Sequence, residues 1–321
     1  MNILSNEPKL TVAICTHNRQ QLLADSLDSL LGLPGAGALP WEALIVDNAS
    51  TDGTWERAHS YMLAYPDKVR YVFEPTPGLS RSRNTAIAAA RGIAIAFIDD
   101  DVYLGPTWCD AVFAALTAWP EVSCFGGKVS PRFECAKPEW LEAGLLAVYG
   151  HIDLGQDVCR FHYPEHPFGC NMIFRRSVFD RVGTFSVSLG RTPGSLLSNE
   201  ESHLFYRLAQ AGQPVLYLPE ALVYHRIPAA RLTDDWVVAR YYWQGRSNAV
   251  FQQMVAPRPR TALWHCGWSG VTEAIGEFRE RRWSPRRIYW LFKKLPVWQQ
   301  AEYATRIGMG IGEIRHAIGL R

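Results

Sequence analysis

The sequence predicts an α/β fold in which a mostly parallel sheet is sandwiched by helices and followed by a basic helical segment. Two patterns indicate this fold. Across the first hundred residues, short apolar runs alternate with stretches in which apolar residues recur at helical spacing. Polar residues, several of them acidic, follow directly after the apolar runs. The composition agrees, because 321 residues with 48% hydrophobic and 20% charged side chains are ordinary for a globular protein.

The first half supplies four strands and three helices. We expect strands at residues 10–15, 41–48, 69–73 and 93–98, and helices at residues 19–31, 52–65 and 78–91. This alternation is typical of a parallel sheet that is covered by helices. Such sheets bind ligands outside the carboxyl ends of their strands, so the polar residues found there are candidates for a site.

The second half is less regular. We expect a helix at residues 106–119, a strand at 121–130, a loop-rich region at 131–167, and a strand with a short helix within 168–185. A helix at 199–212 ends at a glycine, and two strands follow at 214–219 and 221–226. From Thr233 the pattern is helical, with interruptions at residues 256–260, near Pro285 and near Pro296.

Composition and spacing disfavour several classes of protein. The seven cysteines never form a C-x-x-C pair, so neither a zinc site nor a disulfide framework is expected. No apolar run approaches the roughly 20 residues of a membrane span. Residues 1–19 lack the basic and apolar regions of a signal peptide. We therefore expect a cytoplasmic protein, with the inner face of a membrane as the alternative location.

The predicted strand at residues 93–98 runs into three adjacent carboxylates, Asp99, Asp100 and Asp101. Such groups repel one another and are costly to bury unless a positive group lies among them. A divalent cation such as Mg²⁺ or Mn²⁺ meets this need, because it takes one or two carboxylates and leaves positions for phosphate oxygens. The alternative is an exposed acidic turn at the end of a strand.

Six stretches of the chain together resemble one family. Those in the first hundred residues are VAICTHNR (12–19), LIVDNASTDGT (44–54), PGLSRSRNTAIAAARG (77–92) and FIDDD (97–101). In this order they are similar to blocks of the family 2 glycosyltransferases of the GT-A fold, a Rossmann-like α/β fold. FGCNMIFRRSVFDRVGTF (168–185) resembles the family's acceptor-side block, and NEESHLFYRLAQAG (199–212) resembles its E-D helix.

The resemblance also implies a domain organisation. It covers residues 9–250 and implies a GT-A catalytic domain at residues 1–255. Within that domain, the nucleotide-sugar half is expected at about 9–130 and the acceptor half at about 131–255. Residues 256–321 are expected to form a basic, Trp-rich helical segment.

The resemblance implies three nucleotide-binding residues on the donor side. Asp47 matches an aspartate that accepts a hydrogen bond from the nucleobase. Thr16 begins the first nucleotide-facing loop, and Arg83 matches an arginine that lies beside the nucleotide.

The acidic triplet fits the family's D-x-D pattern. In this pattern Asp99 lies near the ribose and the metal, and Asp101 binds the metal. Asp100 is the alternative for either position, because a triplet leaves the register open. His225, after an apolar run, matches a histidine that many GT-A enzymes contribute as a further metal ligand. The alternative for His225 is a structural role at the end of a strand.

The E-D helix carries the expected catalytic base. The family's second acid is the base, which here is Glu201, with Glu in place of Asp and one methylene of extra reach. Glu200 is the alternative base. Both acids are also accounted for if they merely stabilise the N-terminus of a helix through its dipole.

These roles imply a metal-dependent inverting transfer of a sugar from a nucleoside-diphosphate donor to an acceptor hydroxyl, with Mn²⁺ or Mg²⁺ as cofactor. A UDP-sugar is favoured over a GDP- or dTDP-sugar, and the acceptor is expected to be a glycan or lipid-linked, in surface polysaccharide or glycolipid biosynthesis. One alternative is a sugar-phosphate nucleotidyltransferase, which would need a Gly-rich basic loop after the first strand. The other is an inactive carbohydrate-binding or scaffold protein, which intact acids at Asp101 and Glu201 disfavour.

Residues 256–321 carry 12 Lys and Arg against 5 Asp and Glu, and they hold five of the 12 tryptophans. Basic residues interleaved with Trp are typical of an amphipathic element that contacts a membrane surface peripherally. The alternative is a set of packed helices with a solvated basic face. No nucleic-acid recognition module accompanies the charge, so nucleic acid is not an expected partner.

Overall fold

The computed structural model describes residues 8–35, 39–279, 293 and 295–320. Packing divides the chain into two units. The first unit comprises residues 1–132, 149–187 and 200–226, and the second comprises residues 133–148, 188–199 and 227–321. The boundary predicted at residue 255 falls between two helices that both belong to the second unit.

The first unit contains a sheet with the strand order β3-β2-β1-β4-β8-β6-β9-β5, and β7 pairs with β9. The strands are β1 (Leu10–Thr16), β2 (Trp41–Asp47), β3 (Val69–Phe73), β4 (Ala94–Asp99), β5 (Val102–Leu104), β6 (Cys124–Phe133), β7 (Cys159–Arg160), β8 (Met172–Arg175) and β9 (Val215–Ile227). β1 pairs in parallel with β2 and β4, and β2 pairs in parallel with β3. The parallel half predicted from the sequence is therefore confirmed.

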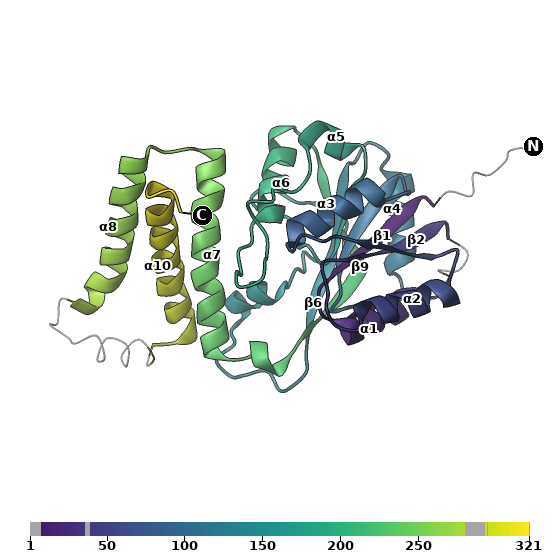
Figure 1. Cartoon of the computed structure of the whole chain (residues 1–321), viewed down its shortest axis with the longest axis horizontal. Helices are drawn as coiled ribbons and strands as arrows, with labels where there is room; N and C mark the ends of the chain where they lie inside the picture. Colours follow the sequence, from purple (N-terminus) through teal and green to yellow (C-terminus); the bar gives the residue numbers. More distant parts are fainter. Residues whose placement is uncertain (1–7, 36–38, 280–292, 294, 321) are drawn as a thin grey trace, which may run out of the picture. The chain divides into compact units, whose positions relative to one another are not determined.

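Helices cover both faces of this sheet. They are α1 (Gln20–Leu31), α2 (Thr54–Ala64), α3 (Leu79–Ala89), α4 (Trp108–Ala118), α5 (Val178–Val182) and α6 (Glu200–Gln210). Leu10, Val12 and Ile14 of β1 join the core with α1, α2 and α4, whereas Ala13 joins the core with α3, α5 and α6. Figure 1 shows α1 and α2 on one side of the sheet and α3, α5 and α6 on the other. Burial on both faces explains why β1 reads as a continuous apolar run.

The second half of the sheet is antiparallel, so the sheet is mixed rather than mostly parallel as predicted. β8 pairs antiparallel with β4 and β6, and β9 pairs antiparallel with β5 and β7. The antiparallel pairs join strands that lie far apart in the chain, β4 with β8 and β5 with β9, so the strand–helix alternation of the first hundred residues does not determine them.

Two strands were predicted where β9 forms one strand of 13 residues. Pro219, which cannot donate to a strand ladder, lies within it. The registered pairs of β9 lie on either side of the proline, at Leu216 and Tyr217 with β7 and at residues 223–225 with β5. β9 therefore runs through the proline as one strand.

A buried asparagine ties the antiparallel half together. Asn171 is fully buried, and its side-chain amide donates to the carbonyl oxygens of Lys128 at 3.1 Å and Ala221 at 2.6 Å. Its side-chain oxygen accepts from the indole N–H of Trp108 at 2.9 Å. A Cβ at Gly127 would lie 2.1 Å from the Asn171 amide nitrogen, so a glycine leaves the room that this amide requires.

The second unit contains helices α7 (Asp234–Val255), α8 (Arg260–Arg279) and α10 (Val297–Ala317). The break predicted at residues 256–260 is confirmed, and the one near Pro285 lies outside the described residues. Glycines allow these helices to approach closely: a Cβ at Gly245 or Gly308 would lie 1.9 Å from a backbone oxygen of the facing helix. Among the described residues, none of the helices is long and apolar enough to cross a membrane.

Candidate functional site

The carboxyl ends of three neighbouring strands bring the predicted donor-side residues together. Thr16 ends β1 and pairs in register with Asp47 at the end of β2. Cys15 pairs with Asp99 at the end of β4 on the other side. The sheet topology alone therefore places Thr16, Asp47 and Asp99 at one edge, as expected for an α/β sheet.

Asp100 turns into the protein and fastens the loop that follows β1. It is 4% exposed, and its carboxylate accepts from the Thr16 hydroxyl at 2.7 Å and from the Arg19 guanidinium at 2.8 Å. Burial raises the pKa of Asp100 to about 6, with Arg19 acting against the rise and the Asp101 carboxylate adding to it. Asp100 therefore holds the loop rather than facing outward.

Arg19 is the positive group that the sequence analysis did not identify. The same guanidinium nitrogen that contacts Asp100 lies 3.2 Å from the Asp101 carboxylate. Its contact across 81 and 82 residues depends on β1 lying beside β4. Its signals in the sequence were its position after the first strand and its place at the end of the block VAICTHNR.

Asp101 and His225 meet because β5 and β9 pair with Val102 opposite His225. The Asp101 carboxylate lies 3.4 Å from Nε2 of His225. The other ring nitrogen, Nδ1, lies 2.6 Å from the carbonyl oxygen of Tyr149, which can only accept, so Nδ1 carries a proton. Burial alone would lower the pKa of His225, but Asp101 and the Tyr149 carbonyl outweigh it and raise the pKa above its ordinary value.

This pair fits a divalent ion. An imidazole whose Nδ1–H is bound to a backbone carbonyl presents Nε2 as the ligand atom, which is the usual arrangement of a metal-binding histidine. A carboxylate and an imidazole supply two ligands. Within the described part of the chain, no group of three or more His, Cys, Asp or Glu residues is placed to hold an ion. An ion at Asp101 and His225 would therefore complete its coordination on substrate oxygens.

Asp47 is fixed at the opposite side of this edge. It is 2% exposed, and its two carboxylate oxygens accept from the backbone N–H of Ser50 at 3.0 Å and from the Tyr71 hydroxyl at 2.9 Å. Burial and the hydrogen bond to Asp47 raise the pKa of Tyr71, so the hydroxyl remains a donor. Each carboxylate oxygen retains a second lone pair, so Asp47 can still accept from a ligand.

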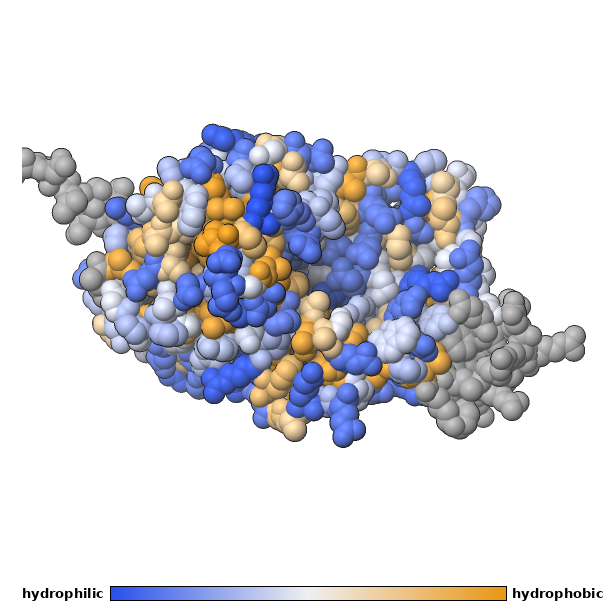
Figure 2. Space-filling view, turned by 180° about the vertical axis from the view of Figure 1, so that it is seen from behind, coloured by the Kyte–Doolittle hydropathy of each residue, from blue (hydrophilic) through white to orange (hydrophobic). Residues whose placement is uncertain are grey.

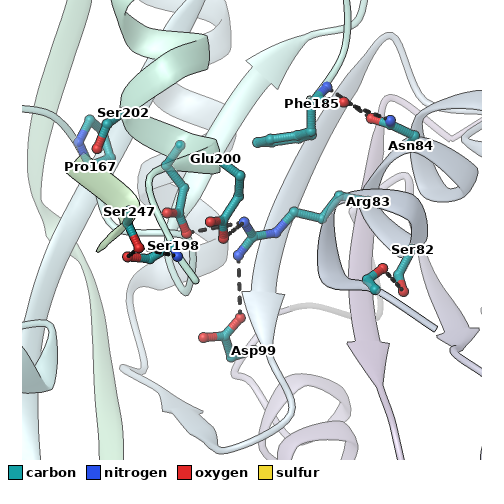
Figure 3. Close-up of polar contacts among 12 residues, drawn as sticks. Ser82, Arg83, Asn84, Asp99, Pro167, Phe185, Ser198, Glu200, Ser202 and Ser247 are labelled. Atoms are coloured by element: carbon teal, nitrogen blue, oxygen red, sulfur yellow. Dashed lines mark hydrogen bonds and ion pairs between the residues drawn. The ribbon is translucent and has the colours of Figure 1, made fainter. Parts of the chain in front are cut away.

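Arg83 of α3 lies at the centre of an ion-pair network (Figure 3). It is 2% exposed, and one guanidinium nitrogen lies 3.0 Å from both Glu200 and Glu201. The other lies 3.8 Å from Asp99 at the end of β4. One arginine therefore connects a donor-side carboxylate with both candidate bases.

The two glutamates begin α6 and differ in exposure. The side chain of Glu200 is 3% exposed and that of Glu201 is 17% exposed. Burial alone would raise the pKa of Glu201, but Arg83 and His166 lower it below its ordinary value. Glu201 is therefore ionised at neutral pH, as a general base must be.

His166 and Gly169 had no role in the sequence analysis. The His166 ring donates from Nδ1 to the Pro167 carbonyl at 2.8 Å and lies 2.9 Å through Nε2 from the Ser202 hydroxyl. It stacks on Phe205 with ring centroids 5.0 Å apart. Gly169 lies against Arg83 and Glu201, and its place in the acceptor-side block was its only signal in the sequence.

Comparisons with known proteins agree with this architecture. The family model for glycosyl transferase family 2 matches residues 11–183, more than half of the chain. The chain is 27% identical to the glucosyl-dolichyl phosphate glucuronosyltransferase of Haloferax volcanii, with 75% of this chain and 77% of that protein covered. It is 23% identical to the succinoglycan biosynthesis protein ExoM of Rhizobium meliloti, with 82% and 81% covered.

Solved structures show the same fold. The mannosyltransferase PcManGT of Pyrobaculum calidifontis, in complex with GDP-Man and Mn²⁺, matches with a TM-score of 0.58 at 20% identity over 97% of this chain and 86% of that one. GalNAc-T7 with UDP, GalNAc and Mn²⁺ matches with a TM-score of 0.56 at 15% identity over 76% and 51%. These likenesses confirm the predicted GT-A fold. The chain therefore belongs to glycosyl transferase family 2, and it is a glycosyltransferase.

Proposed function

We propose that this glycosyltransferase is metal-dependent and inverting, and that it transfers a sugar from a nucleoside diphosphate to an acceptor hydroxyl. The observation that carries the proposal is the Arg83 network. The guanidinium of Arg83 lies 3.8 Å from the carboxylate of Asp99 on the donor side and 3.0 Å from that of Glu201. A donor-binding edge and an ionised carboxylate thus lie within the reach of one side chain. Transfer in a single displacement needs both groups in one place.

The donor side uses the ends of β1, β2 and β4. Asp47 would accept from the nucleobase, Thr16 would lie along the nucleotide, and Asp99 would lie near the ribose. Asp101 and His225 would hold Mn²⁺ or Mg²⁺, which when bound neutralises charge on the departing diphosphate. Asp100, which accepts hydrogen bonds from Thr16 and Arg19, would hold the loop after β1 in place beside the residues that bind the metal.

Glu201 would remove the proton of the acceptor hydroxyl. Its partial exposure leaves it open to an acceptor, whereas Glu200 is buried against Arg83. The proton leaves as the acceptor oxygen bonds to the anomeric carbon and the bond from that carbon to the diphosphate oxygen breaks. Attack from the face opposite the diphosphate inverts the configuration at that carbon.

The acceptor we propose is a glycan or a lipid-linked sugar. The relatives named above include a glucosyl-dolichyl phosphate glucuronosyltransferase and a succinoglycan biosynthesis protein. These names support a role in surface polysaccharide or glycolipid biosynthesis.

We also propose that the outer face of α8 contacts an anionic membrane. Trp264, Trp268 and Ile275 are 40%, 46% and 38% exposed, and their spacing places them on one helix face. Figure 2 shows a face of the molecule on which hydrophilic side chains predominate and hydrophobic ones gather in separate patches. Co-sedimentation with phosphatidylglycerol vesicles checks this: a W264A/W268A variant should lose binding, and a W55A variant, also exposed, should retain it.

A donor panel tests the function. UDP-, GDP- and dTDP-sugars are each incubated with and without Mn²⁺, and nucleoside diphosphate release is measured with an acceptor extract present. Metal-dependent release with one donor, which we expect to be a UDP-sugar, supports the proposal. Pyrophosphate release from a sugar phosphate and a nucleoside triphosphate would instead indicate a nucleotidyltransferase. Donor binding without any turnover would indicate an inactive carbohydrate-binding protein.

A further inference from the structure

We propose that Arg83 is a positioning residue that holds Glu201 for proton abstraction, and that Gly169 leaves the space this contact requires. The inference rests on the proposed function, because it takes Glu201 as the base. It differs from the expectation that Arg83 lies beside the nucleotide.

The guanidinium of Arg83 is directed at carboxylates. One nitrogen lies 3.0 Å from Oε1 of Glu200 and 3.0 Å from Oε1 of Glu201. The other lies 3.8 Å from Asp99, a longer and weaker contact. Since Arg83 is 2% exposed, its hydrogen bonds to the two glutamates are shielded from water and fix their carboxylates.

A ring and an asparagine support Arg83 from behind. The Phe185 ring centroid lies 5.4 Å from the guanidinium carbon. The side chain of Asn84, the next residue on α3, donates to the Phe185 carbonyl and accepts from the Phe185 N–H, both at 2.9 Å (Figure 3). These two bonds fix the backbone that carries the ring. The arginine side chain therefore has little freedom to move when its partners change.

Gly169 lies directly against the contact between Arg83 and Glu201. A Cβ there would lie 2.1 Å from Nη2 of Arg83 and 2.1 Å from Oε1 of Glu201. Its backbone is not in the left-handed region, so alanine is compatible with the local conformation. The obstacle to alanine is therefore the ion pair itself, which must separate to admit a methyl group.

The contact between Arg83 and Glu201 also affects the pKa of Glu201. The charged or titratable groups around Glu201 are Arg83 on α3, Glu200 on α6, and His166 and Cys170 on the segment before β8. Burial favours the protonated acid, and Arg83 is the largest influence that lowers the pKa. Replacing Arg83 with a neutral residue leaves burial without its main counterweight, so the pKa of Glu201 must rise.

The experiment compares R83Q, R83K, G169A and the control G270A, whose added Cβ meets nothing within 4 Å. For each variant we measure the pH profile of kcat/KM for transfer and the Kd of the nucleoside diphosphate. We expect R83Q to shift the acid limb upward by at least one pH unit and to lower kcat about 100-fold, as a misplaced group does. R83K should return the acid limb of the pH profile to its position in the unmodified protein, because an ammonium keeps the positive charge. It should not restore kcat, because an ammonium lacks the planar set of donors of a guanidinium.

G169A should lower kcat at least tenfold with an unchanged Kd, and G270A should behave as the unmodified protein. An R83Q variant that weakens nucleotide binding tenfold while its acid limb stays in place would overturn the proposal, because Arg83 would then serve the nucleotide. A G169A variant with full kcat would overturn it as well. Either result leaves transfer by the unmodified protein intact, whereas absence of transfer from every donor would refute the proposed function itself.

Discussion

The assignment of the base predicts a sharp difference between two neighbouring amides, E201Q and E200Q. A glutamine at 201 keeps an Oε1 that can accept from Arg83 at 3.0 Å, so the site should remain in place while the base is lost. General bases contribute about 10²- to 10⁴-fold to a rate. We therefore expect kcat to fall by that factor, which corresponds to about 3–5 kcal/mol in the activation barrier.

The same change at residue 200 should act mainly on stability. Glu200 is 3% exposed and shares its Arg83 nitrogen with Glu201, so E200Q replaces an ion pair with a hydrogen bond from the guanidinium to a neutral amide oxygen. That replacement costs about 1 kcal/mol. We expect the free energy of unfolding to fall by this amount and kcat to change less than tenfold.

The assay is transfer of labelled sugar under saturating donor, with the Kd of the nucleoside diphosphate measured in parallel. E201Q should bind the nucleotide as the unmodified protein does and fail to transfer. Equal kcat values for E201Q and the unmodified protein would refute the assignment, and a larger loss in E200Q would move the base to Glu200.

Three further predictions concern the metal, the core and pH. D101A should abolish turnover and remove the Mn²⁺ dependence of nucleotide affinity, measured by calorimetry; a D157A control, on an exposed side chain, should change neither. N171A should lower the free energy of unfolding by about 3–5 kcal/mol, because it leaves the Trp108 N–H and two carbonyls without this partner; urea denaturation with a loss under 1 kcal/mol would contradict this. Burial lowers the pKa of His166 below its ordinary 6.5, so the unfolded state takes up a proton more readily and stability falls as the pH drops below that value. An H166F variant should lose less stability than the unmodified protein between pH 7.5 and 5.5, and equal losses would contradict the reasoning.

The parallel half of the fold could be predicted because its signals are local. The strands β1, β2 and β4 are apolar runs buried on both faces, and each helix between β1 and β4 has one apolar side. The order of these elements predicts that Thr16, Asp47 and Asp99 lie at one edge of the sheet.

The antiparallel half could not be predicted in the same way. β5 has three residues and exists because β9 pairs with it, a contact between residues 102–104 and 223–225. A strand this short has no periodicity of its own to detect. Pro219 lies within β9, which forms one strand where two were predicted.

The site was predicted by residue type but not by contact. The acidic triplet predicted a divalent cation as its positive partner, whereas Arg19, which contacts Asp100 and Asp101, lies more than 80 residues earlier. The roles of Arg83 and Gly169 depend on three segments meeting in space, the helix α3, the N-terminus of α6 and the residues before β8. No pattern within one segment records such a meeting.

The proposed transfer depends on Asp101 and His225 binding a divalent cation together with a nucleoside diphosphate. An anomalous difference map from a crystal soaked with Mn²⁺ and UDP tests it most directly. We predict a peak within bonding distance of the Asp101 carboxylate, Nε2 of His225 and the diphosphate oxygens. Bound UDP with no manganese peak beside these two side chains would contradict the account.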